Sequence, residues 1–130
     1  MPTRPLSPHL SVYKFKYTMV TSILNRFTGA GLSVGLLLLV YWLTAVAAGA
    51  QAQARAGRIL ATPLAKLLYV GLVIAFSYHL IAGVRHLIWD TGRGLEREQA
   101  RRSAWVVAVI SVALMILIIY CAGLSGGRAR

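Results

Sequence analysis

Three long apolar stretches, separated by short polar segments, dominate the pattern of hydrophobic and polar positions along this chain. They coincide with gaps between charged residues, because no Asp, Glu, Lys or Arg lies between Arg26 and Arg55, Lys66 and Arg85, or Arg102 and Arg128. A helix crosses a bilayer core about 30 Å thick with about 20 apolar residues. The shortest gap suffices, since Lys66 and Arg85 can extend their aliphatic stems toward the interface. The pattern predicts an all-α membrane protein with three transmembrane helices.

Breaking and capping residues set the expected limits of these helices. The first residues are rich in proline and lack a helical period, which predicts an irregular N-terminal arm over residues 1–20. Thr62 and Pro63 fit the N-cap and the first position of the second helix, and Ser103 fits the N-cap of the third. Thr18 or Thr21 is expected to cap the first. The three spans, which form one unit over residues 21–127, are expected at 21–49, 63–88 and 103–125.

Two connectors join the spans. Residues 48–61 consist mostly of small side chains and are expected to form a loop with some helical character. Residues 90–103 are polar, and Gly92 and Gly94 are expected to break the helix there. Lys and Arg are concentrated in the N-terminal segment up to Arg26 and in residues 85–102, which together hold nine of the 14 in the chain. Because cytoplasmic loops carry the excess of these residues, we expect both segments on the cytoplasmic side.

The net charge of +11 changes the picture little. In a soluble protein it would suggest nucleic acid as a partner. Here the cations crowd the ends of the apolar segments, where lipid headgroups and membrane topology account for them. We therefore expect a membrane-lipid environment and no nucleic-acid partner.

Candidate metal chemistry is confined to histidine, because Cys121 is the only cysteine and cannot form a Cys-x-x-Cys site. The stretch SYHLIAGVRHLIWD, residues 77–90, places His79 well inside an apolar helix, where an ionisable side chain indicates function. A neutral histidine bonded to a neighbouring helix is the plain alternative. Gly83, one turn on, leaves room for a flat macrocycle. Since neutral imidazole is a standard axial ligand of haem iron, the stretch predicts a haem ligated by His79.

Arg85 and His86 fit the other end of such a haem. They lie about 10 Å further along the helix than His79, which matches the reach from iron to propionates. His86 at the interface without a ligand is the plain alternative. His79 and His86 project from one side of one helix and cannot both bind one iron, and His9 belongs to the arm. A second axial ligand would have to come from another chain.

A second polar group follows one face of the first helix. Its members share i, i+4, i+7, i+11 spacing: Ser22, Arg26, Gly29 and Ser33. Ser22 and Arg26 at the membrane edge can hydrogen-bond a carbonyl of a lipid-soluble quinone, and Arg26 can also pair with a haem propionate. A snorkelling Arg26 is the plain alternative. Gly31 and Gly35, nearly opposite, indicate close helix packing.

Residues 4–29, RPLSPHLSVYKFKYTMVTSILNRFTG, together with residues 77–90, resemble the cytochrome b large membrane-anchor subunit of succinate dehydrogenase, respiratory complex II. The resemblance covers most of the chain. It implies that His79 ligates haem b, that Ser22 and Arg26 line a ubiquinone pocket, and that Arg26 also lies near a propionate.

The same resemblance implies that His86 lies beside the propionates. The chain departs from many relatives at Asn25, where they have histidine, although asparagine can still donate a hydrogen bond.

The resemblance also implies the partners. The family works with a flavoprotein, an iron–sulfur protein and a second small anchor, which supplies the other histidine to a shared haem b. Succinate is oxidised elsewhere, as part of the tricarboxylic acid cycle, and electrons reach quinone at this chain. The expected location is a bacterial inner (cytoplasmic) membrane, multi-pass, with the N-terminus in the cytoplasm.

Three alternatives stay open on the sequence: a fumarate reductase anchor, a haem-free structural anchor, and a transporter subunit. Transport is disfavoured, because no span carries an acidic residue and no pair of broken helices would form a site at the midplane.

Overall fold

The structure, a computed structural model, describes the backbone of residues 17–127 and the side chains of residues 19–124. This part of the chain is entirely helical, with no strand, and its elements are α1 (Tyr17–Ala47), α2 (Ala50–Leu60), α3 (Pro63–Asp90) and α4 (Arg97–Gly127). Three of them are long and apolar enough to cross a membrane, over Met19–Ala47, Pro63–Asp90 and Arg97–Leu124. The predicted fold class is confirmed.

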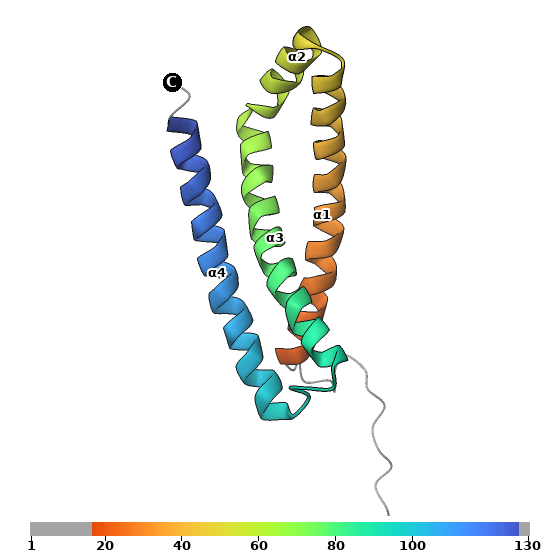
Figure 1. Ribbon diagram of the computed structural model, residues 1–130, viewed down its shortest axis with the longest axis vertical. Helices are drawn as coiled ribbons and strands as arrows, with labels where there is room; N and C mark the ends of the chain where they lie inside the picture. Colours follow the sequence, from red (N-terminus) through yellow and green to blue (C-terminus); the bar gives the residue numbers. More distant parts are fainter. Residues whose placement is uncertain (1–16, 128–130) are drawn as a thin grey trace, which may run out of the picture.

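The three long helices lie side by side, with α3 between α1 and α4 (Figure 1). The shorter α2 crosses the end where α1 and α3 are joined, and the connector from α3 to α4 lies at the other end, near the start of α1 (Figure 1). A chain with three antiparallel spans brings the beginning of the first and the end of the second to one side. That side carries most of the arginines and all three acidic residues: Asp90, Glu96 and Glu98.

The start of α3 agrees with the prediction. Thr62 is its N-cap, with an extended backbone (φ −64°, ψ 152°), and its Oγ1 accepts a hydrogen bond of 3.4 Å from the amide of Ala65. Pro63 occupies the first helical turn, where its missing N–H costs nothing.

Two helix starts differ from the prediction. α1 begins at Tyr17, so residues 17–20 of the predicted arm are helical, and neither Thr18 nor Thr21 is a cap. α4 begins at Arg97 and not after Ser103, because Glu98 stabilises the first turn through ion pairs with Arg101 (3.2 Å) and Arg102 (3.0 Å). The rest of the arm, with His9, lies outside the described residues.

The segment predicted as a loop, residues 48–61, is helical over most of its length. The alanine-rich sequence favours a helix, and Gly49, with φ +98°, separates α2 from the end of α1. Ala56 is buried against the bundle, while Arg55 and Arg58 are exposed. α2 is therefore an amphipathic cap at the end of the bundle opposite the arginine-rich connector.

Small side chains let α3 approach its neighbours. On α4, buried residues at helical spacing face α3: Ala100, Ala104, Val107 and Ser111. On α1, a Cβ at Gly35 would lie 2.8 Å from Cδ2 of Leu72, whereas one at Gly31 would meet nothing within 4 Å. Close packing at the predicted Gly-x-x-x-Gly pair therefore involves Gly35 within this chain. Small residues at such crossings allow close backbone contact in lipid.

Candidate functional site

His79 is the centre of the candidate site, and it faces α1. Its ring is part-buried, with Nδ1 3.1 Å from the carbonyl oxygen of Asn25 and 3.3 Å from Oγ1 of Thr28. The plain alternative, a histidine hydrogen-bonded to a neighbouring helix, accounts for Nδ1 but not for Nε2. The other nitrogen decides what the residue can do.

The hydrogen bonds fix the tautomer of His79. A carbonyl oxygen only accepts, so the bond to Asn25 places the hydrogen on Nδ1. Thr28 Oγ1 donates to the carbonyl of Leu24 (2.8 Å), which leaves an oxygen lone pair facing Nδ1. Nε2 of the neutral ring then carries a lone pair, and the described residues include no recorded partner for it. Metal-bound histidines in proteins have this arrangement, with one nitrogen held by a carbonyl and the other on the metal.

Two glycines leave space near this residue, one on α1 and one on α3. A Cβ at Gly29 would lie 3.1 Å from Cε1 of His79, so only glycine lets α1 approach the imidazole this closely. At Gly83, one turn further along α3, a Cβ would meet nothing within 4 Å. The open space beside Gly83 agrees with the predicted room for a flat group.

Asn25 contributes a second signal at the same place. Its side-chain oxygen Oδ1 is buried and has no hydrogen-bond partner among the described residues. Buried polar atoms are nearly always paired, so this oxygen is an exception in the contact between α1 and α3. The backbone carbonyl of Asn25 accepts the hydrogen bond from His79, and its side-chain oxygen has no partner among the described residues.

A haem is the metal group that these side chains fit. Within residues 17–127, no group of three or more His, Cys, Asp or Glu side chains lies close enough to hold a metal ion. A haem needs only one or two axial ligands from protein, and a neutral imidazole with an oriented Nε2 provides one. Gly29 lets the ring lie close to α1, and the position of Gly83, one turn further along α3, is open.

Ser22 and Arg26 lie on the flank of α1 beside this contact. Ser22 is part-buried, and Arg26 is exposed with no recorded bond to another described residue. Gly29 belongs to their predicted face and also touches His79, so the structure brings that face against the histidine. Ser33 lies further along, exposed, and its hydroxyl donates to the carbonyl of Gly29 in its own helix (3.2 Å).

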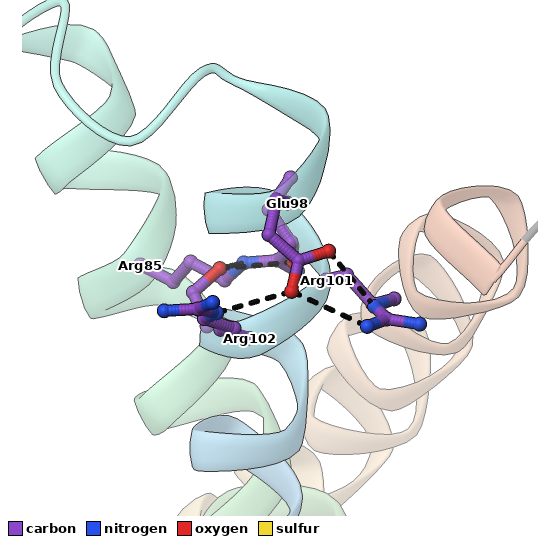
Figure 2. A network of polar contacts seen from close by, with 6 residues as sticks. Arg85, Glu98, Arg101 and Arg102 are labelled. Carbon is purple, nitrogen blue, oxygen red and sulfur yellow. Dashed lines mark hydrogen bonds and ion pairs between the residues drawn. The ribbon is translucent and has the colours of Figure 1, made fainter.

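Arg85 points away from His79, toward α4. Only 6% of it is exposed; its Nε donates to Oγ of Ser103 (2.9 Å) and its Nη2 to the carbonyl of Ala100 (2.8 Å). Figure 2 shows Arg85 reaching α4 near Glu98, which lies between Arg101 and Arg102. These recorded bonds make Arg85 a clamp between α3 and α4.

The ring of Trp89 lies under this clamp and joins it to the connector. The guanidinium carbon of Arg85 is 4.0 Å from the ring centroid, a cation–π distance. Trp89 Nε1 donates to the carbonyl of Gly94 (3.0 Å), and the ring of His86 meets Trp89 edge-on at 5.3 Å between centroids. His86, seven residues from His79, thus sits on the His79 side of α3, near the end of that helix.

Arg85→Ala should lower the thermal stability of the purified complex. The substitution removes the hydrogen bonds of the guanidinium to Ser103 and Ala100 and leaves a cavity in its place. The loss of bonds from a charged donor costs roughly 1.5–3 kcal/mol of stability. The measurement is thermal unfolding in detergent, with Arg97→Ala, an exposed arginine of α4, as the matched control. Equal melting temperatures for the two variants would contradict a clamp at Arg85.

Two contacts of the site were not predicted. Thr28 supports the His79 ring, and Tyr78, the residue before His79, donates from its hydroxyl to the carbonyl of Thr21 (3.0 Å). Asn25, Thr28 and Gly29 recur at i, i+3, i+4, a spacing that marks one helix face. That spacing was the available signal, but it does not say which neighbouring helix the face meets.

Comparison with known proteins agrees with the resemblance seen in the sequence. The model of the succinate dehydrogenase/fumarate reductase transmembrane subunit family matches residues 1–118. The succinate dehydrogenase cytochrome b556 subunit of Paracoccus denitrificans is 42% identical over 114 residues, which cover 88% of each chain. The cytochrome b556 subunit of Rickettsia felis is 34% identical over 115 residues, 88% of this chain and 90% of the relative.

A mitochondrial relative extends the comparison beyond bacteria. The succinate dehydrogenase cytochrome b560 subunit of Sus scrofa is 36% identical over 113 residues, 84% of this chain and 66% of the relative. The family model spans all of α1, α2 and α3 and most of α4. The chain therefore belongs to the family of succinate dehydrogenase/fumarate reductase transmembrane subunits.

Proposed function

We propose that this chain is the cytochrome b membrane-anchor and electron-transfer subunit of a succinate:quinone oxidoreductase. It binds haem b through Nε2 of His79 and lines the quinone site with Ser22 and Arg26. The observation that carries the proposal is the orientation of His79, whose Nδ1–H is held by the carbonyl of Asn25 while Nε2 is left for a ligand. The relatives named as succinate dehydrogenase cytochrome b subunits support it.

The protein prepares the axial ligand in three ways. The bond from Nδ1 to Asn25 sets the ring plane and the direction of the Nε2 lone pair, and Thr28 Oγ1 lies 3.3 Å from the same Nδ1. Gly29 allows α1 to approach the ring. When bound, the haem supplies a one-electron carrier inside the membrane. A haem held by His79 would need a further protein ligand from another polypeptide, the second small anchor, because His86 lies on the same side of α3 as His79.

Cations at one end of the bundle balance the propionates. Arg26 is exposed and available for a direct contact, and His86 can donate a hydrogen bond from the same side of α3 as His79. Arg85 contributes its charge from the clamp with α4, where its recorded bonds go to Ser103 and Ala100. Carboxylates at the edge of an apolar core are stable only with such partners.

Ser22 and Arg26 hold the quinone head group at the same edge of the membrane. The Ser22 hydroxyl and the Arg26 guanidinium donate to one quinone carbonyl oxygen. Reduction to quinol takes up two electrons and two protons, and negative charge builds on that oxygen as electrons arrive. Donors placed where the charge develops lower the barrier, because they need no reorganisation.

The rest of the complex supplies the electrons. The flavoprotein oxidises succinate, the iron–sulfur subunit passes the electrons on, and the iron–sulfur subunit docks at the end that carries the connector and the start of α1. In this proposal that end is cytoplasmic, in a bacterial inner membrane, with the N-terminus on the same side. The relatives compared are named for succinate dehydrogenase, which favours succinate oxidation over fumarate reduction, and the prepared Nε2 of His79 favours a cytochrome over a haem-free anchor.

Ser22→Ala and Arg26→Ala should each depress quinone reduction by the intact complex. Loss of a bond involving a charged group weakens binding by roughly 1.5–3 kcal/mol, which is about tenfold to a hundredfold. Succinate oxidation with a soluble dye should persist, because that reaction does not use this site. Matched controls are Ser33→Ala, whose hydroxyl bonds its own helix, and Arg55→Ala at the far end. Unchanged quinone kinetics in both test variants would reject the quinone site.

A further inference from the structure

Two consecutive residues of α3 reach across to two carbonyls of α1. Tyr78 donates from its hydroxyl to the carbonyl of Thr21 (3.0 Å), and His79 donates from Nδ1 to the carbonyl of Asn25 (3.1 Å). The accepting residues are four apart, so their carbonyls lie one turn apart on the same side of α1. A carbonyl has two lone pairs and can accept such a bond in addition to its own helical bond; the carbonyl of Asn25 also lies 3.0 Å from the hydroxyl of Thr28.

These two bonds act on the residues that follow the carbonyls. Thr21 directly precedes Ser22, and Asn25 directly precedes Arg26. Neighbouring residues of a helix are separated by a fixed rise of about 1.5 Å and a fixed rotation, so holding one residue sets the next. The pair of bonds therefore sets the height and the rotation of Ser22 and Arg26 relative to His79.

The bond from Tyr78 matters most near the beginning of α1. The helix starts at Tyr17, and the first turns of a helix lack part of their internal hydrogen bonds and fray more easily. With His79 alone, α1 would be held at Asn25 and could tilt about that point. A second attachment one turn nearer the helix start removes that freedom.

We propose that Tyr78 is a positioning residue of the quinone site, an inference that rests on the function proposed above. Its hydroxyl does not contact quinone; it holds the carbonyl of Thr21 and so places Ser22 and Arg26 at a fixed position relative to the haem ligand. Tyr78 and His79 thus tie the quinone site and the haem site together through adjacent residues of one helix.

Tyr78→Phe tests this, because it removes only the hydroxyl and keeps the ring packed. We expect the KM for quinone to rise about threefold to tenfold, the effect of losing one hydrogen bond that orders a binding site. The rate of succinate oxidation with a soluble dye and the haem spectrum should stay at the values of the unmodified complex. A residue that merely stabilised the fold would change all three readouts together. Tyr120→Phe, an exposed tyrosine of α4, is the matched control.

The outcomes separate this inference from the proposed function. If Tyr78→Phe leaves the quinone KM unchanged while Ser22→Ala raises it, the positioning role is overturned and the quinone site stands. If Ser22→Ala and Arg26→Ala both leave quinone kinetics unchanged, the site fails and the role of Tyr78 fails with it. An equal rise in Tyr120→Phe, or loss of haem in Tyr78→Phe, also overturns the positioning role.

Discussion

Replacing His79 with alanine should remove the low-spin haem spectrum from the purified complex or convert it to a high-spin spectrum. In the function proposed above, this imidazole is the axial ligand from this chain, and its Nδ1 bond to Asn25 leaves Nε2 for iron. Without it, iron keeps at most the ligand from the other anchor. The measurement is the visible spectrum of the complex, reduced against oxidised.

His86→Ala is the control for the identity of the ligand. His86 lies against Trp89 near the connector, and its loss should shift the haem band at most, with the low-spin form retained. A low-spin spectrum that survives His79→Ala, or that disappears in His86→Ala, would show that the ligand has been misassigned.

Side chains at Gly29 should expel or displace the haem in proportion to their size. A Cβ there would lie 3.1 Å from Cε1 of His79, a tight contact that requires the ring to move by a few tenths of an ångström. Overpacking of this kind costs about 1–3 kcal/mol, so we expect haem retention to weaken roughly fivefold to more than a hundredfold from Gly29→Ala to Gly29→Val. The measurement is the ratio of haem to protein after purification.

Gly31 provides the matched control on the same helix. A Cβ at Gly31 would meet nothing within 4 Å in this chain, so Gly31→Ala should keep the haem content of the unmodified complex. Full haem content in Gly29→Val would contradict the close approach of α1 to the His79 ring as a requirement of the site.

The fold was largely predictable from the sequence, because the bilayer imposes strong rules. Long gaps between charged residues indicate spans, and the pair Thr62 and Pro63 marks a helix start that the structure confirms. The start of α4 was not predictable in this way. Ser103 looked like a cap, yet it lies inside the helix, where it accepts a bond from Arg85. Which partner a serine meets depends on packing.

The candidate site was predictable at its centre but not in its surroundings. The depth of His79 in an apolar helix points to a ligand, and this can be seen in one segment alone. The contacts with Asn25 and Thr28, and the bond from Tyr78 to Thr21, depend on how α1 is rotated against α3. A single sequence carries no direct record of that rotation. The same reason explains why the direction of Arg85, toward α4, was not foreseen.

An experimental structure of the purified complex tests the central proposal most directly. We expect Nε2 of His79 at about 2 Å from a haem iron, the usual distance between imidazole nitrogen and a metal. Nδ1 should still donate to the carbonyl of Asn25, and the opposite axial ligand should be a histidine of a different polypeptide. A haem bound through His86, two axial ligands from this chain, or an Nε2 of His79 hydrogen-bonded to protein with no iron beside it would contradict the proposal.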